Sequence, residues 1–223
     1  MAYTTIDNPS EHFNTVLHTG NSTDATSITG VGFQPDWVWT KGRSNSGDHF
    51  IHDSSRGAQK NLNTNDNGEE ATTSQGLQSF DSDGFTMGIL GGMNYNSQTY
   101  VNWLWKANAG TTASNSDGGI SSTVQVNSTA GFSIILYTGT GSTSTVGHGL
   151  GDTPDWILYK RRGSGTRDWM VYHQITGSKG MILNSTSAGD SASSIFGGNL
   201  PTSTTIPVGF ATETNTNGES HIA

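Results

Sequence analysis

The chain has 223 residues, of which 31% are hydrophobic, and its formal net charge is −8, with 10 Lys plus Arg against 18 Asp plus Glu. The scarcity of basic residues disfavours nucleic-acid binding, and the lack of a long apolar run disfavours a membrane span. Cysteine is absent, so disulfide bonds and thiolate metal sites are excluded.

The N-terminal segment, residues 1–12, is polar and contains Asn8-Pro9, which predicts an extended arm. No secretory signal is expected, because residues 1–20 lack a basic start followed by an apolar core. Residues 13–19 then form the first expected strand. The next begins after Pro35, which suits the first position of a strand, and it places Trp37 and Trp39 on one face.

Later segments continue the period-two pattern. Residues 49–53 read as a strand, and residues 79–88 read as a hairpin with Asp-Gly near its tip. Residues 98–107 form a long aromatic strand. Residues 111–130 are poor in apolar side chains at first, which predicts a linker followed by a bridging strand. Short alternating runs separated by turns predict an all-β protein, although low apolar content with 30 glycines would also suit disorder.

An internal repeat organises these strands. Trp156 follows Trp37 by 119 positions (156 − 37), and Phe132 follows Phe13 by the same interval. The repeat predicts two tandem related β-sandwich units, jelly-roll-like, with long Gly/Ser/Thr-rich loops. The expected boundaries are 13–110 for repeat 1, 111–130 for the linker and bridging strand, and 131–223 for repeat 2.

The second copy has no counterpart of Trp103-Leu104-Trp105-Lys106. Either its last strand is short, or it is cut at Ala223 and the natural chain continues; we expect the latter.

Several phrases, kept in order along nearly the whole chain, resemble a repeat module of virion fibre proteins of tailed phages, best known from phages of marine bacteria. In the first half they are Gly-Phe-Gln-Pro-Asp-Trp-Val-Trp-Thr-Lys (32–41), His-Asp-Ser-Ser-Arg-Gly-Ala (52–58), Ser-Phe-Asp-Ser-Asp-Gly-Phe-Thr-Met-Gly (79–88) and Thr-Tyr-Val-Asn-Trp-Leu-Trp-Lys-Ala (99–107). In the second half they are Tyr-Thr-Gly-Thr-Gly (137–141), Val-Gly-His-Gly-Leu-Gly (146–151) and Trp-Met-Val-Tyr-His (169–173).

The resemblance implies a non-enzymatic virion structural protein, a tail fibre or a fibre-like decoration that contributes to assembly and host-surface contact. It implies a chain made in the host cytoplasm and displayed on the particle exterior. The expected partners are copies of the chain itself, as a homo-oligomer and most simply a trimer, and other virion proteins. The resemblance supplies no catalytic, cofactor-binding or metal-binding residues, and no cofactor is expected.

Acidic turns and histidines are the candidates for other chemistry. Asp81-Ser82-Asp83-Gly84 could form half of a calcium loop, and Asp66-Asn67-Gly68-Glu69-Glu70 shares that ambiguity, but hairpin turns explain both better. His49 and His52 lie three residues apart, on opposite faces of a strand, and His148 lies between glycines without a local acid. We therefore assign none of them to a metal or to catalysis.

Asp36 and Asp155 occupy equivalent places in the two copies. Paired carboxylates could serve sugar hydrolysis, but a duplicated position better suits strand-start side chains that bond local backbone N–H groups. Nothing in the sequence gives a nucleophile, a base and an orienting residue at recognisable spacing. A polysaccharide depolymerase is therefore only a second alternative.

The aromatic residues and two loops leave a first alternative open. Six tryptophans could form a sugar-stacking platform, but we expect them in cores; they are Trp37, Trp39, Trp103, Trp105, Trp156 and Trp169. The loops 41–47 and 163–167 are equivalent candidates for glycan contact in a lectin-like receptor-recognition module. The two roles, virion structure and glycan binding, are compatible.

Overall fold

The computed structural model describes residues 8–189 and 193–223, so residues 1–7 of the expected arm lie outside the described range. The rest of the arm contains a single 3-10 turn, η1 (Pro9–Glu11). Nearly all other regular structure is antiparallel β-sheet, which confirms the predicted all-β class. The chain forms two compact units: the first ends at Thr111 but omits residues 65–69, which group with Thr112–Ala223 in the second.

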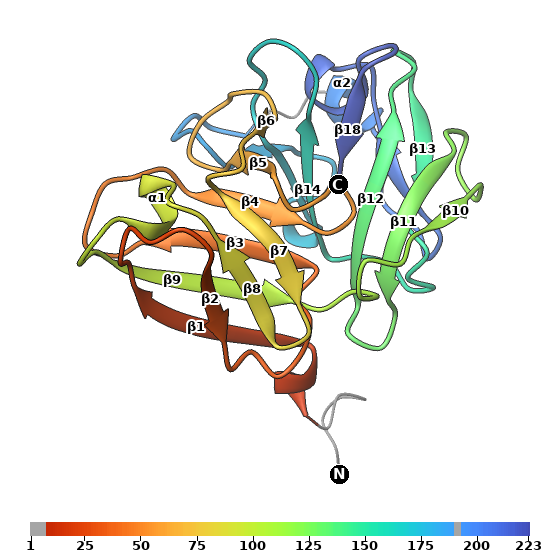
Figure 1. Cartoon of the computed structure of the whole chain (residues 1–223). Coiled ribbons are helices and arrows are strands. Elements are labelled where there is room, and N and C mark those ends of the chain that lie inside the picture. The colour runs from red at the N-terminus through yellow and green to blue at the C-terminus, as the bar shows by residue number, and fades with distance from the viewer. Residues whose placement is uncertain (1–7, 190–192) are drawn as a thin grey trace. The chain divides into compact units, whose positions relative to one another are not determined.

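The first unit holds nine strands and one short helix in the described part of the chain (Figure 1). They are β1 (Phe13–Thr19), β2 (Thr26–Thr29), β3 (Trp37–Gly42), β4 (Phe50–Asp53), β5 (Lys60–Asn63), β6 (Ala71–Thr72), β7 (Leu77–Asp81), β8 (Gly84–Met87), α1 (Gly91–Asn94) and β9 (Thr99–Trp105).

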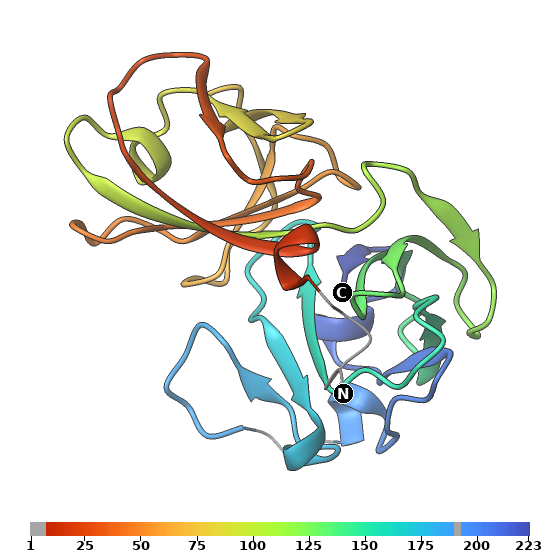
Figure 2. The same cartoon turned by 90° about the horizontal axis from the view of Figure 1, so that it is seen from below.

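Two antiparallel sheets form the first unit, and their facing sides enclose its core. The long sheet has the order β1-β9-β3-β4-β5-β6 and the short one β2-β8-β7, and Figure 2 shows the β7–β8 hairpin lying over the long sheet. Side chains alternate along β9, so every second residue is fully buried and its neighbours are half-exposed. The buried cluster draws on both sheets and α1; it contains Ile28, Val31, Phe33, Val38, Phe50, Leu77, Phe85, Met87, Met93 and Leu104.

The second unit holds the remaining elements. They are β10 (Ala113–Asn115), β11 (Ser122–Asn127), β12 (Phe132–Thr138), β13 (Ser144–Gly147), β14 (Trp156–Arg161), β15 (Met170–His173), η2 (Gln174–Thr176), β16 (Met181–Ile182), α2 (Ser193–Phe196), β17 (Thr205–Val208), α3 (Thr212–Asn215) and β18 (Ser220–Ile222). Its sheets have the orders β10-β11-β12-β18-β14-β15-β16 and β13-β17.

The strand pairings of the two units correspond. The order β1-β9-β3-β4-β5 matches β12-β18-β14-β15-β16, and the pair β2-β8 matches β13-β17. The registers match too: β1 pairs Leu17 with Val101, and β12 pairs Leu136 with Ile222. A one-residue slip would turn every side chain to the opposite face, so equal registers indicate one shared design. This correspondence is what a repeat predicts; the tandem relation of the two units and the jelly-roll detail stay predictions.

A stacked His–Tyr pair repeats with its residue types exchanged. In the first unit His18 on β1 stacks on Tyr100 on β9, with ring centroids 4.9 Å apart. In the second, Tyr137 on β12 stacks on His221 on β18 at 5.1 Å. His18 contacts the Met93 carbonyl at 2.9 Å, and the Tyr137 hydroxyl donates to the Thr214 carbonyl at 2.6 Å. The position keeps its hydrogen bond while the side chain changes.

The boundary between the units differs from the expected linker. Residues 112–130 belong to the second unit, where β10 and β11 extend the sheet beyond β12. The alternating residues of β11 explain this, because Val124 packs into the second core. No helix in the described residues is long and apolar enough to span a membrane.

Candidate functional site

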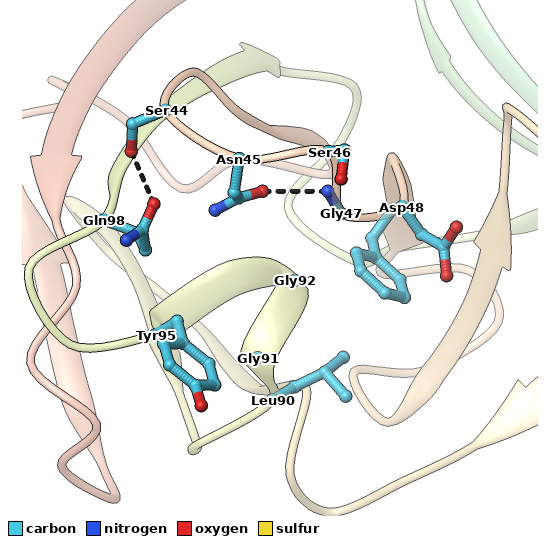
Figure 3. A pocket seen from close by; sticks show the side chains of 11 residues that line it. Ser44, Asn45, Ser46, Gly47, Asp48, Leu90, Gly91, Gly92, Tyr95 and Gln98 are labelled. Atoms are coloured by element: carbon cyan, nitrogen blue, oxygen red, sulfur yellow. Dashed lines mark hydrogen bonds between the residues drawn. The ribbon is translucent and has the colours of Figure 1, made fainter.

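A pocket of about 650 Å³ opens in the first unit, between the loop that joins β3 to β4 and the segment around α1 (Figure 3). This volume lies within the ~300–1,000 Å³ range of small-molecule sites. The residues that line it are Ser44, Asn45, Ser46, Gly47, Asp48, Phe50, Leu90, Gly91, Gly92, Tyr95 and Gln98. We call it the Tyr95 pocket.

Local hydrogen bonds fix the polar wall of the Tyr95 pocket. The Gly47 N–H donates to Asn45 Oδ1 at 2.9 Å, which closes a tight Asx turn. The Ser44 hydroxyl donates to Gln98 Oε1 at 2.8 Å and accepts from the Thr99 N–H at 2.9 Å. These bonds use the amide oxygens of Asn45 and Gln98, so the amide nitrogens remain as donors for a ligand.

The opposite wall carries an exposed aromatic ring. Tyr95 is 62% exposed, and its ring lies across the opening from Asn45 in Figure 3. Its backbone is nevertheless anchored, because the Tyr95 N–H donates to the Tyr100 hydroxyl at 2.9 Å, which in turn donates to the Gly91 carbonyl at 2.8 Å. A fixed backbone therefore presents a solvent-facing ring.

Glycines keep the pocket open. A Cβ at Gly92 would collide with the Phe50 ring, and a Cβ at Gly42 would collide with the Asn45 side chain. Neither position tolerates a side chain without moving a pocket wall. The shape of the pocket thus depends on the lack of a side chain at Gly42 and Gly92.

The second unit has different side chains at the equivalent positions. Arg161 replaces Gly42, Glu213 replaces Gly92 and Glu219 replaces Gln98, which adds three charged groups, while the smaller Thr216 replaces Tyr95. Arg161 is only 7% exposed and donates to Thr216 Oγ1 at 3.5 Å. Glu219 lies so close to Gly163 that a Cβ there would strike its carboxylate. Side chains therefore occupy the place that is open in the first unit.

One ionised group lines the Tyr95 pocket, the carboxylate of Asp48. The Lys41 ammonium lies behind the loop and donates to the carbonyls of Gly42 at 2.6 Å and Asn45 at 3.4 Å. His49, next in sequence to Asp48, has its pKa lowered by burial and by Lys41, against an opposing contribution from Asp48. Burial and the Lys41 charge therefore both disfavour the protonated form of His49.

A family model described as "Domain of unknown function (DUF7483)" matches residues 8–223. The chain belongs to the DUF7483 family. No curated protein and no solved structure matches it. The match covers both units, so the repeat lies within one family domain.

The acidic turns of this DUF7483 chain use their carboxylates internally. Asp81 accepts from the hydroxyls of Ser79 at 2.8 Å and Thr86 at 2.7 Å. Asp83 accepts from the N–H groups of Gly30 at 3.1 Å and Gly32 at 2.6 Å, which lowers its pKa. The predicted hairpin is confirmed as β7–β8, with residues 82 and 83 at its tip.

The second acidic turn, 66–70, begins with an Asx turn in which the Gly68 N–H donates to Asp66 Oδ1 at 2.8 Å. Within residues 8–189 and 193–223, no three His, Asp or Glu side chains converge as a metal ion would require. The expected absence of a cofactor stays a prediction.

Two of the histidines considered in the sequence analysis, His52 and His148, are buried. His52 is fully buried in β4, and its Nε2 accepts from the Leu77 N–H at 3.4 Å. His148 is also buried; one ring nitrogen lies 3.2 Å from the Thr202 carbonyl and the other accepts from the Leu150 N–H at 3.1 Å. His49 lies beside the Tyr95 pocket without lining it.

We expect acid to destabilise the first unit through His52. Burial, and secondarily Arg56, lowers its pKa from 6.5 to about 3. The unfolded chain therefore binds more protons between these values, and the free energy of unfolding falls by roughly 1.4 kcal/mol per pH unit as the pH drops through that window. Urea unfolding at stepped pH should show a shallower dependence for His52→Gln, and an unchanged dependence would contradict this assignment.

The tryptophans divide in a way that corrects two predictions. Trp37 and Trp169 are buried as expected, but Trp156 is 47% exposed, so its placement in a core is wrong. β18 pairs with β14 only at Lys160 and Arg161, which leaves Trp156 uncovered on that side.

The second correction concerns β9. Trp103 and Trp105 share a face with Val101 as predicted, but this face points away from the first core, which takes Leu104 instead. Trp103 instead meets the Trp39 ring edge-on at 6.0 Å, on the outer face of the long sheet. Strand periodicity fixed the shared face correctly, but it could not say which face the core would take.

One buried amine has perturbed chemistry. Lys160 is fully buried in the second unit, and burial lowers its pKa to about 8. Its ammonium donates to the carbonyls of Asn67 at 3.1 Å and of Arg167. Because the Lys160 amine is buried and bonded to these carbonyls, we assign it a structural role and not that of a nucleophile.

Sequence reasoning identified one wall of the Tyr95 pocket, the loop 41–47. The other wall was missed: Gln98 was predicted only as the start of the strand at 98–107, and Leu90 and Tyr95 were not singled out. A comparison of the copies could have found them: Gly91-Gly92-Met93-Asn94-Tyr95 stands where the second copy has Thr-Glu-Thr-Asn-Thr. The other candidate loop, 163–167, lies in the second unit, where Gly163 packs against the Glu219 carboxylate.

Proposed function

We propose that this chain is a non-enzymatic virion structural protein, a tail fibre or fibre-like decoration, that contacts a host-surface glycan through the Tyr95 pocket. The virion part rests on the order of phrases shared with phage fibre repeats. The glycan part rests on one observation, an exposed Tyr95 ring set opposite hydroxyl and amide side chains.

The chemistry of the pocket suits a saccharide. Sugar rings offer apolar C–H faces, which pack on an aromatic side chain, and hydroxyls that both donate and accept hydrogen bonds. Tyr95 and Leu90 supply the apolar surface, while Asn45, Gln98 and Asp48 supply donors and acceptors. A nucleic-acid ligand fits less well, because no basic side chain lines the pocket.

The display role fits the remaining features. The chain has no cysteine, so each β unit folds without a disulfide bond. Its net charge is −8. In this role the chain forms a homo-oligomer, most simply a trimer. The oligomer is displayed on the particle exterior, where it contacts other virion proteins. Light scattering on the purified chain tests this part, and a monomer at micromolar concentration would argue against it.

A polysaccharide depolymerase has less support. Glycoside hydrolysis commonly uses two carboxylates across the scissile bond, whereas Asp48 is the one carboxylate among the residues lining the pocket. Incubation with host polysaccharide should therefore release no product.

The glycan part is tested by screening the purified chain against an array of bacterial surface saccharides. We expect discrete hits that are competed by the same saccharide in solution. A complete lack of hits, with folded protein, would remove the glycan part and leave the structural role as the remaining proposal.

A further inference from the structure

We infer that the Tyr95 pocket takes an uncharged saccharide in preference to an acidic one, and that each chain holds one such site, in the first unit. This inference rests on the proposed glycan contact and adds the ligand's charge class and the stoichiometry. It draws on two separate observations, the charges around the pocket and the occupancy of the equivalent place in the second unit.

The charge around the pocket argues against an anionic ligand. Asp48 is the one ionised side chain among the lining residues, and a ligand carboxylate placed beside it would be repelled. Lys41 is not among the lining residues, and its ammonium donates to the backbone carbonyls of Gly42 and Asn45. Arg43 is solvent-exposed and does not line the pocket.

The hydrogen-bonding groups suit hydroxyls. The amide nitrogens of Asn45 and Gln98 are donors, because their oxygens already accept from Gly47 and Ser44. The Asp48 carboxylate offers only acceptor oxygens, so a ligand group that bonds to it must be a donor. A sugar hydroxyl satisfies both kinds of group, whereas a uronate oxygen can satisfy only the donors.

The second unit explains the single site. Arg161 is 93% buried there (100 − 7) and reaches Thr216, the residue that stands where the first unit has Tyr95. Glu219 presses against Gly163 in the loop equivalent to the polar wall. The second unit therefore lacks both the aromatic platform and the space in front of it.

The test is calorimetric titration of the full chain with matched pairs of methyl glycosides and their uronic acids: glucose with glucuronic, galactose with galacturonic and mannose with mannuronic acid. We expect at least one neutral member to bind about tenfold or more tightly than its acidic partner, with one ligand per chain. Tyr95→Ala should weaken that binding about tenfold or more, whereas Phe210→Ala, which removes an exposed aromatic ring elsewhere, should not.

Asp48→Asn provides the charge test, with Asp152→Asn as the control that removes an exposed carboxylate outside the pocket. The first variant should narrow the gap between neutral and acidic members, and the second should leave it unchanged. Tighter binding of uronic acids through Tyr95 would overturn the charge preference while supporting the glycan contact. Two ligands per chain would overturn the single site. Failure of every saccharide to bind folded protein would overturn the glycan contact itself.

Discussion

Replacement of Asp36 by alanine is expected to lower the free energy of unfolding of the first unit by about 4 kcal/mol. Asp36 is fully buried at the start of β3. Its carboxylate accepts from the N–H groups of Ala107 at 2.7 Å, Ala109 at 2.9 Å and Gly110 at 2.8 Å, and from the Ser54 hydroxyl at 2.7 Å. The variant would leave these donors without their acceptor, which is the costly way to lose a hydrogen bond.

The repeat supplies a matched control. Asp155 stands at the equivalent position in the second unit but is solvent-exposed, so Asp155→Ala should change stability by no more than about 0.5 kcal/mol. Chemical unfolding followed by tryptophan fluorescence measures both. Equal effects from the two variants would mean that the carboxylate of Asp36 does not hold the segment after β9.

Breaking the buried ion cluster around Arg56 is expected to cost about 3–5 kcal/mol. The Arg56 side chain is fully buried and donates to the Asp53 carboxylate, to Glu70 Oε2 at 3.1 Å and to the Ile51 carbonyl at 3.2 Å. In Arg56→Met the Asp53 carboxylate would stay buried without its cation. The loss should appear as a lower urea midpoint for the first unit.

Two further variants separate the cluster from a general effect of removing arginine. Arg43→Met removes an exposed arginine and should stay within about 0.5 kcal/mol of the parent. Adding Asp53→Asn to Arg56→Met should recover part of the loss, since the uncompensated charge is then gone. If Arg56→Met changes the free energy of unfolding no more than Arg43→Met does, the ion cluster contributes little to stability, which would contradict this prediction.

The sequence allowed the strands to be predicted well, because period-two alternation reports directly on backbone geometry. The expected strand at residues 13–19 matches β1 exactly in extent, and the aromatic strand at 98–107 contains β9. Asp36 was predicted to bond local backbone N–H groups; its carboxylate does accept from three backbone N–H groups, but all three lie some seventy residues away, so the local part of the prediction was wrong.

Alternation alone could not assign the faces of strands or the walls of the pocket. A strand with tryptophan on one face and leucine on the other can bury either, and here β9 turns Leu104 to the core and Trp103 outward. The Tyr95 pocket joins loop 43–48 to residues 90–98, and the β3–β9 pairing helps to bring these segments together. Such long-range closure leaves no local pattern in the sequence.

The most direct test of the account is a crystal structure of the chain with a neutral saccharide selected by the array. We predict one sugar per chain, with its apolar face against Tyr95 and its hydroxyls bonded to Asn45, Gln98 and Asp48. A sugar bound at the equivalent place in the second unit, or one that leaves Tyr95 uncontacted, would contradict it.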